Sequence, residues 1–246
     1  MWAGLRLAIT LLTAVPLPGT PGTPDRRTAA AAMYWAPFVG LGLGGAAAGV
    51  LVTCRAGHAG PLLGAVLAIA LLAILTRGLH LDGLADLADG LGSRQPAGQA
   101  LQIMKRSDIG PFGVVTLVLV LLIQVTALAR ADQVGRGPLA IVAATVAARL
   151  AIMLACRPGV PAAQPGLGAM VAGTVNPLAG TVLAQAAVLG AVAVGQIYAL
   201  AIVAGLLVSF ALTAVATRRL GGITGDVLGA VAETTAAVCL LVTAFS

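Results

Sequence analysis

Seven long apolar runs constrain the fold of this chain more than any other feature. They cover residues 31–52, 61–76, 112–130, 138–155, 178–195, 197–216 and 226–245. A helix rises about 1.5 Å per residue and needs about 20 apolar residues to cross a hydrocarbon core of roughly 30 Å, and these runs approach or reach that length. Hydrophobic residues make up 59% of the chain and charged residues 9%, far from the average of soluble domains. The sequence therefore predicts an integral membrane protein.

Helices fit these runs better than strands do. The runs are rich in Ala and Leu, which favour helices, and they lack the period-two alternation of an outer-membrane barrel. We expect an all-α, polytopic helical bundle of about seven spans, one for each run. Frequent Gly and Ala indicate close contacts between small residues of neighbouring helices. Short links between uncut runs indicate one membrane-embedded domain over residues 1–246.

Residues 1–22 form a separate feature. They read MWAGLRLAITLLTAVPLPGTPG, in which a basic residue precedes a short apolar stretch, as in a signal peptide. The apolar stretch stops at Pro16 and is short for a membrane span. An interfacial or re-entrant helix, followed by an irregular Pro- and Gly-rich loop, therefore fits better than a cleaved signal peptide.

Basic residues near the ends of the runs predict the orientation, because Lys and Arg are retained on the cytoplasmic side. Over alternate loops, nine basic residues fall on one side and three on the other. The first side carries Arg26, Arg27, Arg77, Arg94, Lys105, Arg106, Arg157, Arg218 and Arg219, and the second carries Arg55, Arg130 and Arg136. We expect a multi-pass protein of the plasma (inner) membrane whose first side faces the cytoplasm.

Acidic residues crowd into residues 78–94, which read GLHLDGLADLADGLGSR. Asp82, Asp86 and Asp89 stand at positions i, i+4 and i+7, so they share one face if the segment is helical. Topology and anionic lipid explain basic loops but not clustered acids. Converging carboxylates without Cys suit Mg²⁺ or Mn²⁺ rather than Zn²⁺. His80 is a candidate ligand or a hydrogen-bonding neighbour of this cluster.

Basic residues follow the acidic segment directly. Arg94, Lys105 and Arg106 lie within GSRQPAGQALQIMKRSDIGPFG. A metal held by aspartates, beside phosphates held by basic side chains, is the recurrent arrangement of phosphoryl transfer. We therefore expect the main site at about residues 77–111, on the cytoplasmic face.

A second block with binding potential reads RRLGGITGDVLGAVAE. Arg218 and Arg219 precede a Gly-rich turn, and Asp226 stands at the start of the last run. The N–H groups at a helix start bind anions, and glycines permit close approach, so the block is a candidate for substrate binding. Alternatively, the two arginines anchor one span while Asp226 caps the next.

Five sequence blocks occur in a fixed order along the chain. They read ITLLTAVPLPG, YWAPFVGLGLG, GLHLDGLADLADGLGSR, IMKRSDIGPFGVV and RRLGGITGDVLGAVAE. Over most of the chain they resemble the cobalamin synthase family, the adenosylcobinamide-GDP ribazoletransferases, and the HLDGLADxADG pattern carries most of the specificity. The fourth block departs from the family pattern, in which an acid directly follows the basic residue. This chain has Arg106 and then Asp108, so Asp108 is not assigned as a metal ligand.

The resemblance implies a membrane enzyme of nucleotide-loop assembly in cobalamin (vitamin B12) biosynthesis. Such an enzyme joins adenosylcobinamide-GDP to α-ribazole, or to its 5′-phosphate, gives adenosylcobalamin or its 5′-phosphate, releases GMP and uses Mg²⁺. The expected partners are these substrates and the lipid bilayer, nucleic acid is not expected, and a homo-oligomer is left open. Asp82, Asp86 and Asp89 are then the expected metal ligands and catalytic residues, and the expected substrate contacts are His80, Arg94, Lys105, Arg106, Arg218, Arg219 and Asp226.

Two alternatives have some support in the sequence. DLADGLGSR at 86–94 resembles the first half of the DxxDGxxAR pattern of CDP-alcohol phosphotransferases, with Ser93 in place of Ala, but the second half is missing after Arg94. A cation-coupled transporter could use the acidic helix, although transporters usually carry ionisable groups near the bilayer midplane and show repeated halves. Two charges, Arg149 and Glu233, do fall inside apolar runs, and we hypothesise that they form an ion pair.

Overall fold

The computed structural model describes residues 2–17 and 24–245, and within these ranges the chain folds into helices without a strand. The single β-bridge found there joins Ala162 to Ile223. The predicted all-α class is therefore confirmed. In chain order the helices are α1 (Trp2–Leu12), α2 (Arg26–Ala56), α3 (Pro61–Leu75), α4 (Leu79–Gly92), α5 (Ala97–Ile103), α6 (Pro111–Gln133), α7 (Gly137–Ala155), α8 (Leu167–Val171), α9 (Pro177–Val194), α10 (Gln196–Leu220) and α11 (Gly225–Ala244).

Six of these helices, α2, α6, α7, α9, α10 and α11, are long and apolar enough to cross a membrane. A seventh crossing arises if α3 and α4 together count as one span. This span would be a broken one, since the two helices are bent by 88° at the break between them. The predicted number of about seven spans is met on that reading. The run expected at 31–52 begins earlier as a helix, because the Asp25 carboxylate accepts a hydrogen bond from the Thr28 N–H at 2.7 Å and caps α2.

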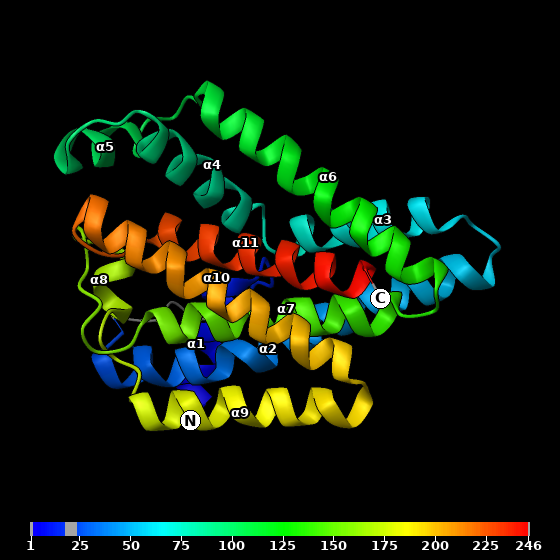
Figure 1. The fold of residues 1–246 in the computed structure, drawn as a ribbon. Helices are drawn as coiled ribbons and strands as arrows, with labels where there is room; N and C mark the ends of the chain where they lie inside the picture. Colours follow the sequence, from blue (N-terminus) through cyan, green and yellow to red (C-terminus); the bar gives the residue numbers. More distant parts are fainter. Residues whose placement is uncertain (1, 18–23, 246) are drawn as a thin grey trace.

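Helix α7 lies at the centre of the bundle, and most of its residues are buried against α2, α10 and α11 (Figure 1). The contact between α2 and α7 depends on two glycines four residues apart, as the many small residues predict. A Cβ added at Gly40 would lie 2.5 Å from the Thr145 carbonyl oxygen, and one added at Gly44 would meet the Thr145 side chain. The backbones of α2 and α7 therefore approach as closely as small residues allow.

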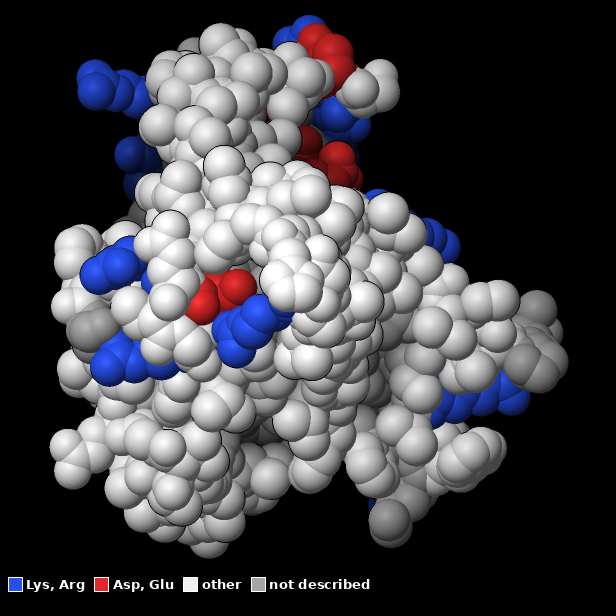
Figure 2. All heavy atoms as spheres, turned by 90° about the vertical axis from the view of Figure 1, so that its right-hand side faces the viewer, with Lys and Arg blue, Asp and Glu red and all other residues white. Residues whose placement is uncertain are grey.

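The connections between the long helices gather at two opposite ends of the bundle (Figure 1). One end, called the site end below, carries the α1–α2, α7–α8–α9 and α10–α11 connections together with α5. The far end carries the α2–α3, α6–α7 and α9–α10 connections. Figure 2 looks onto the far end and shows a mixed basic and acidic group on a mostly uncharged face. Arg55 and Asp132 form an ion pair at 2.6 Å there.

The N-terminal helix α1 is too short to cross a bilayer, as its sequence predicts. It packs against α2, where Gly4 lies so close to Ala31 that an added Cβ would be 2.5 Å from the Ala31 Cβ. Leu7, Ala8 and Leu12 are buried. The chain after α1 is tied to the end of α3 by a hydrogen bond from the Ala14 N–H to the Leu75 carbonyl at 2.5 Å. Part of the predicted Pro- and Gly-rich loop, residues 18–23, lies outside the described residues.

Candidate active site

The break between α3 and α4 sets the direction of the acidic helix. Arg77 and Gly78 adopt left-handed backbone angles, with φ of 54° and 66°. The Gly78 N–H donates to the Ala73 carbonyl at 2.8 Å and the Arg77 N–H to the Ile74 carbonyl at 3.0 Å, which is the hydrogen-bond pattern of a Schellman motif. Helix α3 therefore ends at Leu75, one residue before the end of the expected run, and α4 leaves at 88° toward the site end (Figure 1).

Glycines bring α4 into backbone contact with α11. A Cβ added at Gly83 would lie 2.7 Å from both the Cα and the carbonyl oxygen of Asp226. One added at Gly229 would lie 3.0 Å from the His80 Cα. The glycines of the HLDGLADLADG segment thus serve the packing of α4, and this packing places Asp226 beside the acidic face of that helix.

Three carboxylates from α4 and α11, those of Asp82, Asp86 and Asp226, form what we call the acidic cluster. Asp82 is exposed, whereas Asp86 and Asp226 are half-buried. Both Asp82 and Asp226 lie close enough to Asp86 to repel its negative charge, and Asp82 acts on Asp226 in the same way. Carboxylates held together in this way favour the binding of a cation or of a proton.

Asp89 has a different environment, although it lies on the same face of α4 as Asp82 and Asp86. Its side chain is buried, and its carboxylate accepts hydrogen bonds from the Gly110 N–H at 2.7 Å and the Gly113 N–H at 2.9 Å. These N–H groups lie at the start of α6, where helix donors have no partner within the helix. Asp89 therefore caps α6 and holds the loop before it against α4. Its predicted role as a metal ligand stays a prediction.

The loop between α5 and α6 brings basic side chains to the cluster. Lys105 is exposed and close enough to Asp226 to attract its carboxylate. Arg106 pairs with Asp108 through two hydrogen bonds, from Nε at 3.0 Å and from Nη2 at 3.1 Å, which holds the pKa of Asp108 below its usual value. A pocket of about 370 Å³ next to these groups is lined by residues that include Asp86, Asp89, Arg106 and Asp108.

The other predicted substrate contacts are divided between the surface and the interior. Arg94, Arg218 and Arg219 are exposed and, among the described residues, form no ion pair with the acidic cluster. His80 is buried, with 3% of its surface exposed, and lies inside the bundle. Their predicted roles in substrate binding remain predictions.

Thr224, rather than Asp226, caps the last helix. The Thr224 side-chain oxygen accepts a hydrogen bond from the Val227 N–H at 3.2 Å, and its hydroxyl donates to the Asp226 carboxylate at 3.3 Å. The alternative that Asp226 serves as the N-cap of α11 is therefore wrong. The reason is that the helix begins at Gly225, two residues before the start that Asp226 as N-cap would require. Asp226 stands in the first turn, with its carboxylate in the cluster.

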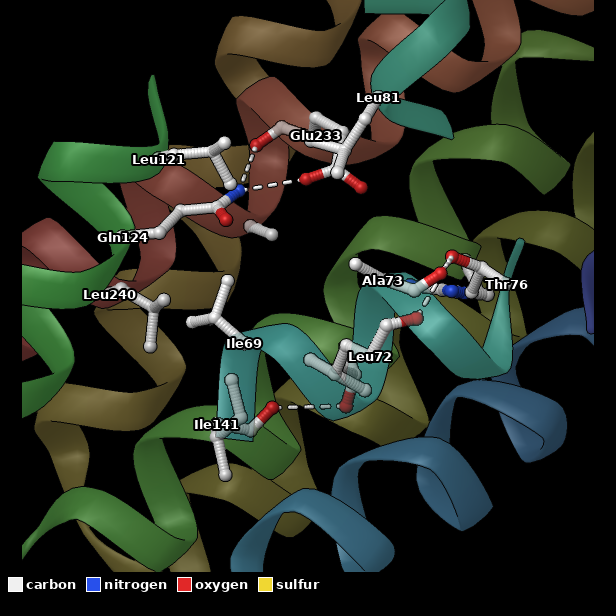
Figure 3. A pocket seen from close by; sticks show the side chains of 13 residues that line it. Ile69, Leu72, Ala73, Thr76, Leu81, Leu121, Gln124, Ile141, Glu233 and Leu240 are labelled. Atoms are coloured by element: carbon white, nitrogen blue, oxygen red, sulfur yellow. Dashed lines mark hydrogen bonds between the residues drawn. The ribbon is translucent and has the colours of Figure 1, made fainter. Parts of the chain in front are cut away.

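A small cavity inside the bundle is lined by both charges expected within spans, and Figure 3 shows Glu233 and Gln124 at its wall. The Gln124 side chain donates a hydrogen bond to the Glu233 carboxylate at 2.8 Å. Arg149 lines the same cavity of about 30 Å³, is 5% exposed, and has no hydrogen-bond partner at Nε. Arg149 and Glu233 attract each other electrostatically, but they form no direct ion pair among the described residues. The hypothesised pair is therefore wrong as a contact, and the cavity has room for a bridging water.

The residues of the site fit a magnesium ion in their chemistry. Asp82 and Asp86 supply hard oxygen donors, and Mg²⁺ usually takes one or two protein carboxylates together with waters and substrate phosphates. Among the described residues, no group of three or more His, Cys, Asp or Glu side chains is arranged to hold a metal. A magnesium ion that takes its remaining ligands from waters and substrate phosphates does not require three protein side chains.

These features define a class of protein. It is a polytopic helical membrane protein with carboxylate and basic groups gathered at one end, as phosphoryl transfer requires. Comparison with known proteins gives the family: the chain belongs to the cobalamin-5-phosphate synthase family, whose profile matches residues 4–244. It is therefore a transferase of cobalamin synthesis, as the resemblance of its sequence blocks predicts, and the two alternative classes are set aside.

Curated relatives cover almost the whole chain. An adenosylcobinamide-GDP ribazoletransferase of Frankia casuarinae is 45% identical over 98% of this chain and 94% of its own length. The protein of the same name from a Nocardioides strain is 41% identical over 96% of each chain. That from Chlorobaculum tepidum is 38% identical over 98% of this chain and 95% of its own. No solved structure matches.

Proposed function

We propose that this chain joins adenosylcobinamide-GDP to α-ribazole, or to α-ribazole 5′-phosphate, with release of GMP, and so completes the nucleotide loop of the cobalamin product. The name shared by its relatives, adenosylcobinamide-GDP ribazoletransferase, supports the two substrates. The observation that carries the proposal is the acidic cluster beside Lys105, because a diphosphate substrate needs positive charge and the reaction needs a proton acceptor.

The reaction is a displacement at phosphorus. A ribose hydroxyl of the ribazole other than the 5′-hydroxyl, which is blocked in the 5′-phosphate, forms a bond through its oxygen to the phosphorus attached to the cobinamide arm, and the bond from that phosphorus to the bridging oxygen breaks. GMP leaves with the electron pair of the broken bond. A carboxylate of the acidic cluster that does not hold a metal accepts the hydroxyl proton, because partial burial and the neighbouring carboxylates favour the protonated form in this cluster.

Magnesium is the proposed cofactor, with Asp82 and Asp86 as the residues that would hold it. When bound, the ion neutralises the diphosphate and stabilises the charge that develops on the leaving oxygen. Lys105 and Arg106 bind phosphate oxygens in this proposal. Asp89 keeps the loop that carries both of these residues against α4 through its hydrogen bonds to Gly110 and Gly113.

The site end is proposed to face the cytoplasm, with the protein in the plasma membrane. Arg26, Arg94, Lys105, Arg157 and Arg219 belong to elements that meet at this end. The far end has fewer basic residues, and one of them, Arg55, is paired with Asp132. The imbalance follows the positive-inside rule.

The reaction is tested with the purified protein in lipid vesicles. Adenosylcobinamide-GDP and α-ribazole are added with Mg²⁺, and both GMP and the joined corrinoid are quantified by chromatography. We expect equal amounts of the two products. A chelator that removes Mg²⁺ should stop turnover, and addition of Mg²⁺ should restore it. Absence of GMP release by the wild-type protein with Mg²⁺ present would contradict the proposed function, and undiminished turnover in the chelator would contradict the cofactor.

A further inference from the structure

A cavity of about 220 Å³ lies behind the acidic cluster, between α1, α2, α4, α7, α8 and α11. Asp226 belongs both to the lining of this cavity and to the cluster, so the cavity adjoins the cluster at this residue. The walls are mostly apolar, and they include Leu12, Met33, Ile152 and Leu228. A ligand that reacts at the cluster can therefore extend an apolar part into the bundle.

His80 supplies the second polar group of this cavity. This residue is 3% exposed, and its Nδ1 has no hydrogen-bond partner. A buried polar atom without a partner destabilises a protein by roughly 1–3 kcal/mol, so such atoms usually serve a ligand, a water or a mechanism. The contact of Gly229 with the His80 backbone fixes the position of this residue on α4.

The size and the polarity of the cavity restrict what it can receive. Pockets for whole drug-sized ligands measure roughly 300–1,000 Å³, so this cavity suits a single small ring system rather than a corrin macrocycle. Guanine carries several donors and acceptors, most of which would find no partner against apolar walls. A fused aromatic ring with one free ring nitrogen matches both the apolar lining and the single histidine.

We infer that this cavity binds the benzimidazole base of α-ribazole and that His80 hydrogen-bonds the ring nitrogen that carries no ribose. The inference rests on the proposed function. With the base in the cavity, the ribose lies at Asp226 and its reacting hydroxyl is directed to the acidic cluster. His80 is then a binding residue that selects the base, whereas Asp82 and Asp86 serve the phosphorus.

The test compares α-ribazole with the matching α-riboside of dimethylindole, in which a C–H replaces the free ring nitrogen. GMP release is measured in vesicles for the wild type and for His80→Leu, at saturating adenosylcobinamide-GDP. We expect His80→Leu to raise KM for α-ribazole about tenfold, the effect of one hydrogen bond, and to leave KM for the indole riboside nearly unchanged. His80→Gln, which restores an N–H donor, should recover part of the loss.

His58→Leu is the matched control, because His58 is exposed in the connection between α2 and α3 at the far end. It should leave both KM values unchanged. A His80→Leu protein that keeps the wild-type ratio of the two KM values would overturn the inference, whether both KM values stay unchanged or both rise by the same factor. Absence of GMP release from the wild type would instead count against the proposed function itself.

Discussion

Asp86 and Asp89 stand three residues apart on α4 and have opposite surroundings. The Asp86 carboxylate faces other acids, and the Asp89 carboxylate faces two backbone N–H groups. Removing each one should therefore change stability in different directions. The first change relieves repulsion, whereas the second leaves two donors at the start of α6 without an acceptor.

We predict that Asp89→Ala lowers the free energy of unfolding by about 1–3 kcal/mol, because charge-assisted hydrogen bonds to buried groups contribute this much. Asp86→Ala should leave the free energy of unfolding unchanged or raise it when Mg²⁺ is absent. Thermal unfolding of both variants in detergent, followed by circular dichroism, checks the prediction. Equal destabilisation by the two substitutions would show that the two carboxylates do not differ as described.

The helix periodicity of residues 78–94 correctly places Asp82 and Asp86 on one face of α4, since both positions follow from local spacing alone. The partners of Asp89 could not be found in this way. Gly110 and Gly113 are 21 and 24 residues further along the chain, and they offer only backbone N–H groups that carry no side-chain signal. A glycine pair just before a long apolar run was the available hint.

At the scale of elements, the contact between α4 and α11 determines whether the acidic cluster forms. Gly83 has no room for a Cβ because the Asp226 backbone occupies the space. Gly→Ala normally stabilises a helix interior by roughly 0.5–1 kcal/mol, so a loss at this position would come from the contact and not from helix propensity.

Gly83→Ala should therefore reduce both the stability of the protein and its rate of GMP release, the latter by about 10²-fold if the reacting groups are displaced by about 1 Å. Gly42→Ala is the control, since Gly42 also lies within a helix but has no atom within 4 Å of an added Cβ. It should be neutral or slightly stabilising. Wild-type turnover in Gly83→Ala would show that the close crossing is not needed for the site.

The run at 61–76 shows that hydropathy predicts an apolar helix but not the direction that the chain takes after it. Composition alone identifies the apolar run, but the helix ends in a Schellman motif whose left-handed position is Arg77. Glycine usually marks that position, and a non-Gly residue there is disfavoured by roughly 1–2 kcal/mol. The sharp bend that aims α4 at the site end is therefore not visible in the sequence pattern.

For the whole molecule, the length and position of the apolar runs predict the class and most helix boundaries, because bilayer thickness fixes helix length. It does not predict which helices meet. The acidic cluster combines residues of α4 and α11. The cavity of about 220 Å³ behind it combines residues of α4 with residues of α1, α7 and α8. Such combinations depend on packing between residues far apart in the chain, such as Gly83 with Asp226.

The orientation of the molecule can be tested with single cysteines. In a Cys54→Ala background, whose other cysteines, Cys156 and Cys239, are buried, Gln95→Cys marks the site end and His58→Cys marks the far end. With a membrane-impermeant maleimide, we expect intact cells to be labelled at position 58, and at position 95 only after permeabilisation. The reverse pattern would place the site end outside the cytoplasm, against the count of basic residues.

The most direct test of the central claim, that the acidic cluster is the active site, is GMP release by Asp82→Asn, Asp86→Asn and Asp226→Asn in vesicles with Mg²⁺. Each substitution removes one charge and keeps nearly the same shape. Asp25→Asn is the control, because Asn caps a helix as well as Asp does and Asp25 lies at the start of α2. We predict a fall in kcat of about 10²-fold or more for Asp86→Asn, smaller losses for the other two cluster variants, and wild-type turnover for the control. Wild-type turnover in all three folded cluster variants would contradict the claim.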